Sequence, residues 1–283
     1  VNLHTIVPGE GAPGAMVHYD TLAHGGQDWQ AYAFHASGTQ QRLVDLADRV
    51  VHRVQLTDLQ PDRVYWFVAG DSTGLTAERA FRTIPDTAGR LRFIAAGDMG
   101  VAEPSRRLQA VAAAQEPRFA LLGGDLAYTN GDWRLAHIWD MWLDNWQELM
   151  VTPSGLTVPM VSAIGNHEVA GGYNGTPDKA PIYLQYLAQD DERSYFVRRV
   201  GPRLVIFLLD SGHLTKHAGA QTEWLTQQLT AHAAVPVRLA TYHVPLFPGF
   251  RLPSGRYSRA GRKHWQPLFD RYGLMAAFEN NDH

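Results

Sequence analysis

Cysteine is absent from this sequence of 283 residues. Its absence excludes disulfide bonds, thiolate metal sites and cysteine nucleophiles, so any metal must be held by nitrogen and oxygen ligands. Long apolar runs are also missing. No stretch approaches the roughly 20 residues needed to cross a bilayer, and no signal peptide is visible. The chain opens with Val1 rather than methionine, which is compatible with a removed leader segment.

A large excess of charge of one sign is missing as well. The net charge is -3, the isoelectric point is near 6.5, and no block of like charges appears. We therefore expect no nucleic-acid-binding surface and no membrane attachment, and any bound anion must be held by local contacts. The composition is 45% hydrophobic, enough over this length to bury a substantial core. The sequence gives no indication of the oligomeric state.

The rhythm of the chain changes near Pro85. Residues 1–84 form short alternating segments separated by Gly, Pro and Asp, a pattern typical of a small all-β sandwich. Residues 88–283 alternate continuous apolar strands with helix-like stretches at 105–115, 137–150, 221–233 and 264–272, which predicts an α/β domain with sheets covered by helices. We place the boundary within 84–89.

Polar side chains follow the apolar strands of the second domain. Asp98, Asp125 and His243 each come at the end of such a run, as does the pair Asn166 and His167. Ligands in open α/β sheets bind beyond the carboxyl ends of the strands, so we expect these side chains to converge. Each residue alone is more typical of a strand-end acid, a turn or a core histidine. Together they predict a metal site.

The donor types narrow the choice of metal. Carboxylate, amide oxygen and imidazole, joined by the phenol of Tyr128, suit Zn, Fe or Mn. The carboxylate of Asp125 is able to bridge two ions about 3.5 to 4 Å apart, as in two-metal hydrolytic sites.

These residues spell a known series of motifs. GDMG (97–100), GDLAY (124–128), GNHE (165–168) and TYHVP (241–245) resemble the GDxG, GDxxY, GNH[ED] and VxxH blocks of calcineurin-like metallophosphoesterases. The chain resembles the purple acid phosphatases in particular. Other members have histidine where Gly100 stands here, and the purple acid branch supplies a tyrosine at the position of Tyr128. The resemblance covers essentially the whole chain and implies that residues 1–84 are a fibronectin-III-like sandwich.

The resemblance also implies a ligand set for two cations, iron paired with zinc, manganese or a second iron. The first would be held by Asp98, Asp125, Tyr128 and His283, and the second by Asp125, Asn166, His243 and position 281. The family has histidine at that last position, whereas this chain has Asn281. Because an amide oxygen is a weaker donor than imidazole, we expect the second cation to be held less tightly.

The implied activity is hydrolysis of a small phosphate monoester by a metal-bound hydroxide, in a periplasmic or secreted protein. His167 resembles the residue that contacts phosphate or protonates the leaving oxygen. A role in orienting Asn166 is the alternative. Tyr173 and Asn174, in a glycine-rich loop, are candidates for substrate contacts, and an ordinary connecting loop is an equal alternative. His264, in a basic segment, is a further candidate, but a place on a solvated basic face is the favoured interpretation for it.

Other interpretations remain open. The same core could serve a phosphodiesterase or nucleotidase. Alternatively, Asn281 and the aromatic residues of the first domain could indicate a binding protein with a weakened enzyme domain. Glu168 is expected to hydrogen-bond and orient a metal-binding histidine rather than to act as a catalyst. His213 and His217, spaced as on a zinc-binding helix, lack a third ligand nearby in the sequence and are expected at the surface.

Overall fold

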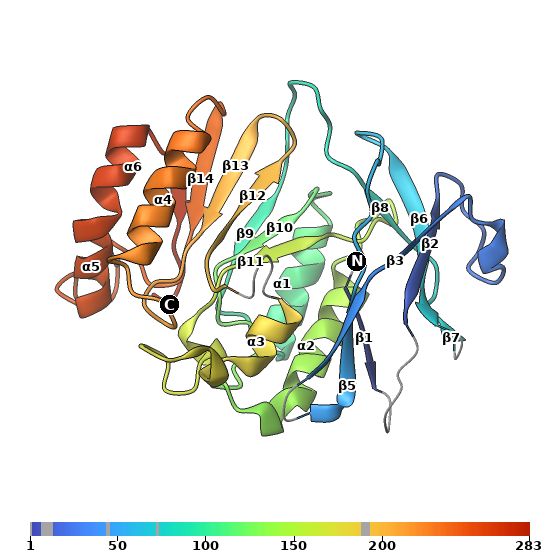
Figure 1. Cartoon of the computed structure of the whole chain (residues 1–283), viewed down its shortest axis with the longest axis horizontal. Coiled ribbons are helices and arrows are strands. Elements are labelled where there is room, and N and C mark those ends of the chain that lie inside the picture. The colour runs from blue at the N-terminus through green and yellow to red at the C-terminus, as the bar shows by residue number, and fades with distance from the viewer. Residues whose placement is uncertain (1, 7–13, 44–45, 72–73, 188–192) are drawn as a thin grey trace.

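The computed structural model describes residues 2–6, 14–43, 46–71, 74–187 and 193–283. Within these ranges the first part of the chain is built of strands and one short 3-10 helix (Trp29–Ala31), whereas from residue 94 onward strands alternate with helices. Figure 1 shows the two parts side by side. The expected mixed α/β fold is confirmed.

The first part contains two antiparallel sheets. One has the order β1 (Asn2–Ile6), β5 (Leu46–Arg53), β4 (Thr39–Leu43). The other has the order β3 (Phe34–Ser37), β2 (Met16–Asp20), β6 (Val64–Asp71), β7 (Gly74–Leu75), with β8 (Arg79–Arg82) also paired to β6.

The first of these sheets also packs on the second part of the chain. Leu43 and Val51 belong to the same apolar cluster as Trp139 and Tyr183, which lie on two helices beyond residue 130. Arg49 forms an ion pair with Asp140. The assignment of residues 1–84 to a fibronectin-III-like domain and the boundary at 84–89 stay predictions.

The second part contains two sheets packed face to face. The first is parallel throughout: β9 (Ile94–Ala96), β10 (Ala120–Leu122), β11 (Met160–Ser162). The second has the order β12 (Phe196–Val200), β13 (Leu204–Leu208), β14 (Val237–Thr241), β15 (Ala276–Phe278), with only the β12–β13 pair antiparallel. Leu121 and Ala163 meet Ile206, Leu208 and Leu239 between the sheets, where apolar burial holds them together.

Helices cover both outer faces of this pair of sheets (Figure 1). On the side of β10 lie α1 (Glu103–Ala113), α2 (Ala136–Leu149) and α3 (Pro181–Tyr186). On the side of β13 and β14 lie α4 (Ala220–Ala231) and α6 (Gln266–Tyr272), with α5 (Arg256–His264) leading into α6. Short 3-10 helices span Trp133–Leu135, Asn166–Glu168 and Pro177–Lys179.

The predicted helices are confirmed within a few residues, but α3 and α5 were not predicted. The second of these, α5, has an unusual cause. Its sequence RYSRAGRKH has little apolar character, and its buried residues are Ser258 and Gly261. A Cβ at Gly261 would come within 2.6 Å of Leu246. The helix is therefore placed by a close backbone approach rather than by an apolar face. None of the helices in the described ranges has the length and apolar character needed to cross a bilayer.

Candidate metal centre

The loops after β9 and β10 are bound to each other by their main chains. The N–H of Asp98 donates to the carbonyl of Gly124 (3.0 Å), and the N–H of Met99 donates to that of Asp125 (2.8 Å). Both aspartates have left-handed backbones, with φ of 51° and 55°. Such conformations are costly for residues with a Cβ and persist where the surroundings impose them, often at functional sites.

Glycines precede the polar residues because other chain segments pass very close. A Cβ at Gly97 would lie 2.4 Å from the Asn280 side chain, and one at Gly123 would lie 1.6 Å from it. A Cβ at Gly165 would lie 2.3 Å from an oxygen of Asp125. Any side chain at these positions would therefore displace the last segment of the chain or the aspartate.

Three of the predicted ligands converge in a cluster. Asp98, Asp125 and His243 each offer a ligand atom, and these atoms lie within 4.8 Å of one another. His243 Nε2 is 3.0 Å from Asp125 Oδ2 and 3.1 Å from the side-chain oxygen of Asn166. The residues come from different sheets, since His243 follows β14 while the others follow β9, β10 and β11.

The orientation of His243 suits a cation. Its Nδ1 lies 2.9 Å from the carbonyl of Gly123, so Nδ1 carries the proton and Nε2 faces two side-chain oxygens. Burial alone would lower the pKa of His243, but its hydrogen bond with Asp125 and the charge of that carboxylate raise it. A positive charge is therefore favoured at this point, supplied either by a proton or by a metal ion.

A second group of residues gathers around Asp98. Tyr128 Oη lies 3.5 Å and His283 Nε2 lies 3.6 Å from Asp98 Oδ1. Burial raises the pKa of Tyr128, and the charges of Asp98 and Asp125 raise it further. A bound cation would lower this pKa again, so ionisation of the Tyr128 phenol requires a cation beside it.

Asn281 is buried and reaches this group through its main chain. Its N–H donates to Asp98 Oδ2 at 2.8 Å, and its backbone is left-handed with φ of 64°. The residue is 4% exposed. Asn281, predicted to complete the second set of ligands, thus lies beside Asp98. Binding of a cation by its amide oxygen stays a prediction.

His167 is held at the edge of the cluster. Its main-chain N–H donates to Asp125 Oδ1 (2.8 Å), and its ring lies against that of Tyr128 with centroids 4.3 Å apart. Its Nδ1 lies 2.5 Å from the side-chain oxygen of Asn130, leaving Nε2 directed toward Asp125 at 3.8 Å. Asn130 was missed in the sequence, where it is typical of a turn beside Gly131.

Glu168 does not hold a histidine, so that expectation was wrong. Its buried carboxylate accepts hydrogen bonds from the main-chain N–H groups of Asp125 (2.7 Å), Leu126 (2.8 Å) and Gly165 (2.8 Å). Burial raises the pKa of Glu168 to about 7, with the charge of Asp125 adding to the effect. Because its three partners are all donors, the ionised carboxylate fits them best, and it fastens the loop after β10 to the loop after β11.

Aromatic rings line one side of the cluster. Tyr173 Oη lies 3.4 Å from the side-chain oxygen of Asn166, and its ring stacks on Tyr257 (4.2 Å) and on His213 (4.9 Å). Asn174 is exposed and donates to Tyr257 Oη (2.7 Å). The predicted loop residues therefore lie beside the cluster, with Tyr173 nearer to it.

Two other histidines differ from expectation. His213 and His217 are 0% and 3% exposed, so their predicted surface location was wrong. They occupy an irregular segment that folds inward because Asp210 accepts main-chain hydrogen bonds from Gly212 through Thr215. His264, at the end of α5, lowers the pKa of His217, for which burial is the main cause. A substrate contact for His264 stays a prediction.

The arrangement can be compared with known proteins at two levels. In structure the chain is similar to PhoD, with a TM-score of 0.66 and 14% sequence identity over 98% of this chain and 68% of that one. This similarity supports the fold. No family model matches the chain.

In sequence the chain is similar to purple acid phosphatases. It is 23% identical to purple acid phosphatase 23 of Arabidopsis thaliana over 276 residues, which cover 85% of this chain and 58% of that protein. It is 22% identical to purple acid phosphatase 13 of the same plant over 288 residues, covering 86% and 51%. The chain spans about half the length of these curated relatives. The purple acid phosphatase-like relationship expected from the motifs is confirmed.

Proposed function

We propose that this chain is a metal-dependent phosphoesterase with a two-cation centre. The observation that carries the proposal is the meeting of Asp98, Asp125 and His243 from separate strands, with their ligand atoms within 4.8 Å. The residues fit cations because their oxygen and nitrogen lone pairs face one another, and too few hydrogen-bond donors are present to satisfy them. The similarity to purple acid phosphatases supports the same conclusion.

The proposed ligands divide into two groups that share Asp125. One group would be Asp98, Tyr128 and His283, and the other Asn166, His243 and Asn281. Bound cations would supply a water of lowered pKa and stabilise the charge on the phosphoryl oxygens. Glu168 would keep Asp125 in place through three main-chain hydrogen bonds. Iron together with zinc, manganese or a second iron suits this mixture of donors.

His167 would act on the substrate from the open side of the cluster. Asn130 fixes its Nδ1, so Nε2 is the atom able to hold a proton for the leaving oxygen. Its side chain is 33% exposed, which leaves room for a substrate to approach. General acid catalysis of this kind contributes about 10² to 10⁴-fold.

Metal content and turnover measured on one preparation test this proposal. Purified protein would be loaded with Fe, Zn or Mn, dialysed, and analysed for bound metal and for hydrolysis of an aryl phosphate monoester and the matching diester. We expect bound metal and metal-dependent hydrolysis, with the monoester preferred. Faster hydrolysis of the diester would instead assign a phosphodiesterase. Bound metal without hydrolysis would favour the binding protein, and absence of both would overturn the metal centre.

A further inference from the structure

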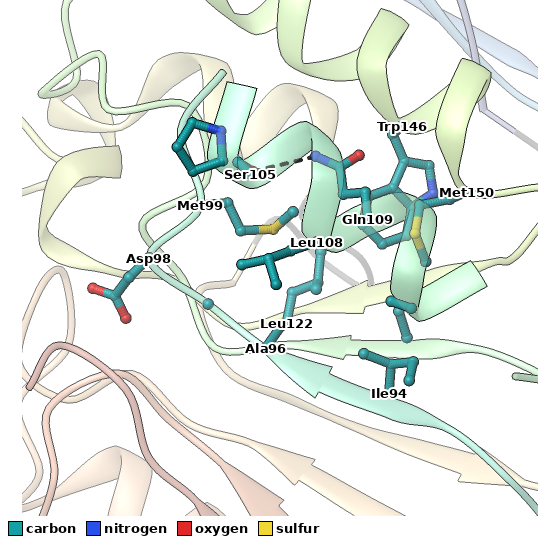
Figure 2. Close-up of a pocket in the computed structure, with 14 residues that line it drawn as sticks. Ile94, Ala96, Asp98, Met99, Ser105, Leu108, Gln109, Leu122, Trp146 and Met150 are labelled. Carbon is teal, nitrogen blue, oxygen red and sulfur yellow. Dashed lines mark hydrogen bonds between the residues drawn. The ribbon is translucent and has the colours of Figure 1, made fainter. Parts of the chain in front are cut away.

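The last residues of the chain lie against the candidate metal centre. Asp98 turns its carboxylate away from the apolar pocket under α1 and α2 (Figure 2). The main-chain N–H of Asn281 donates to one of its oxygens at 2.8 Å, and His283 Nε2 lies 3.6 Å from the other. Any group bound by Asp282, the residue between these two, is therefore held close to the cluster.

Asp282 fastens the loop that connects β14 to α5. Its carboxylate accepts hydrogen bonds from the main-chain N–H groups of Phe250 (2.6 Å) and Arg251 (2.9 Å). The guanidinium of Arg262, on α5, donates to two main-chain carbonyls near the two ends of the same loop. The loop is thus held in one conformation by side chains on both sides, which lowers the entropic cost of using it to bind a ligand.

This arrangement leaves the side chain of Arg251 available. The side chain is 55% exposed, and its Nε is the atom nearest to Asp282, at 3.7 Å. Among the residues that the structure describes, its two terminal nitrogens meet no hydrogen-bond partner. The guanidinium of Arg262, in contrast, is engaged by the carbonyls of Leu246 and Pro253. Arg251 is therefore able to bind a carboxylate or phosphate through two parallel hydrogen bonds.

The position of this charge relative to the cluster follows from the groups that sense it. Burial raises the pKa of Tyr173 to about 12 and the charge of Asp125 raises it too, whereas Arg251 lowers it. The Tyr173 hydroxyl lies 3.4 Å from the side-chain oxygen of Asn166. Arg251 is not among the main groups that shift the pKa of Asp125 or of His243. The guanidinium therefore lies at the edge of the cluster, near Tyr173, and not among the proposed ligands.

We propose that Arg251 binds a second anionic group, carried by the leaving group of the substrate. This inference rests on the proposed phosphoesterase function and narrows its substrates to phosphate esters with a negative charge beyond the phosphate. The net charge of -3 provides no general attraction for anions, so a local cation is needed. Phe250 and Leu252 flank Arg251 in the sequence and are 83% and 77% exposed. Exposed apolar residues beside a site are typical of ligand-binding surfaces, so an apolar skeleton between the two charges suits this loop.

Calorimetry with two phosphonates tests the proposal. The para-carboxybenzylphosphonate carries the second charge, and para-carbamoylbenzylphosphonate replaces that charge by a neutral group of the same shape. Neither is hydrolysed, because carbon takes the place of the ester oxygen. We expect the zinc-loaded protein to bind the carboxylate compound about fivefold more tightly, the upper range for an exposed ion pair. Added salt should reduce this preference by screening the charges.

Variants separate recognition by Arg251 from a structural role. Arg251→Gln should abolish the preference and leave the affinity for the carbamoyl compound unchanged, because the main-chain N–H that binds Asp282 is retained. Arg251→Lys should keep part of the preference, since it keeps the charge. Arg259→Gln, at an exposed position of α5, is the matched control and should keep all of it. The proposal is overturned if the wild-type protein shows no preference, or if Arg251→Gln weakens both phosphonates equally.

Hydrolysis measured on the same samples distinguishes this proposal from the proposed function. In Arg251→Gln, kcat/KM for para-carboxyphenyl phosphate should fall about fivefold relative to that for para-carbamoylphenyl phosphate. The intrinsic reactivities of the two esters cancel, because the ratio is compared between proteins. If the wild-type protein hydrolyses neither ester but keeps its preference between the phosphonates, the phosphoesterase function is overturned while anion binding by Arg251 is supported.

Discussion

The two halves of the proposed metal centre differ in how firmly they are held. His243 is fully buried, and its two ring nitrogens contact Gly123, Asp125 and Asn166 at 2.9 to 3.1 Å. His283, in the other half, has a side chain that is 68% exposed and lies 3.6 Å from Asp98. The half that contains Asn281 was expected from the sequence to bind its cation less tightly. Its histidine is nevertheless the more buried of the two and makes the closer contacts.

The donor strength of a ligand and the rigidity of its surroundings are therefore separate properties. An amide is a poorer donor than imidazole, but a buried set of ligands needs little reorganisation when a cation enters. An exposed histidine is a good donor, yet water can replace it at small cost.

Asp125→Asn should cause the largest loss, because in the proposed centre this carboxylate would be shared by both halves. We expect turnover of an aryl phosphate to fall about a thousandfold, the upper range for removal of one group that stabilises the transition state electrostatically. Asp132→Asn is the control, since Asp132 pairs with Arg134 outside the cluster. A variant at Asp125 that kept a tenth of wild-type turnover would mean that the halves do not share it.

His243→Ala and His283→Ala compare the two halves directly. The buried substitution should lower turnover or metal affinity about a hundredfold and the exposed one about tenfold, spanning the range for metal-site partners. The reason is that loss of His243 leaves Asp125 and Asn166 facing each other in a buried space. Metal titration and kinetics on both variants give the ratio of the two losses in metal affinity and in turnover. Equal losses would contradict the difference in support.

Glu168→Gln should weaken the hydrogen bonds that connect the loop after β10 to the loop after β11. The carboxamide would turn an N–H₂ group toward main-chain donors that now meet oxygen. We expect the free energy of unfolding to fall by about 2 kcal/mol and the melting temperature by roughly 5 °C. Glu103→Gln, an exposed carboxylate on α1, should change stability by less than about 0.5 kcal/mol. Similar stabilities for the two variants would refute the role of Glu168.

Asn281→His should have the smallest effect. The main-chain N–H that donates to Asp98 is retained, while imidazole replaces the amide as a donor. We expect the affinity of the second cation to rise about tenfold, the lower range for changes in metal-site partners, with a smaller gain in turnover. Competition with a chelator measures the affinity, and Asn281→Ala serves as comparison. If all three proteins bind metal equally, position 281 does not contact the cation.

Much of the fold was visible in local patterns. Continuous apolar runs predicted β9, β10, β11, β13 and β14, and spacings of three and four predicted α1, α2, α4 and α6. The strands β12 and β15 were not predicted; β15 has only the three residues AAF, of which both alanines are exposed. The helix α5 escaped because its contact with Leu246 depends on Gly261 rather than on an apolar stripe. Packing between distant segments overrides local propensity in such cases.

The sequence predicted the three residues that converge in the candidate site, but not the contacts that hold them in place. Asp98, Asp125 and His243 stood out together, because each follows an apolar strand and the three offer metal-binding donor atoms. The partners of Glu168 are main-chain groups, which no residue type reveals. Asn130 and His213 looked like ordinary loop residues until the fold placed them against His167 and Tyr173.

Local sequence is enough to show which residues end the strands, which donor atoms they carry and which family of motifs they resemble. These properties are set by residue type and by spacing along the chain. Which half of the proposed centre is buried and which is open depends instead on how distant segments pack. Asn281 meets Asp98 across 183 residues, and His243 meets Gly123 across 120. Such contacts depend on how two sheets pack against each other, and that packing is the sum of many weak apolar contacts spread over the whole chain.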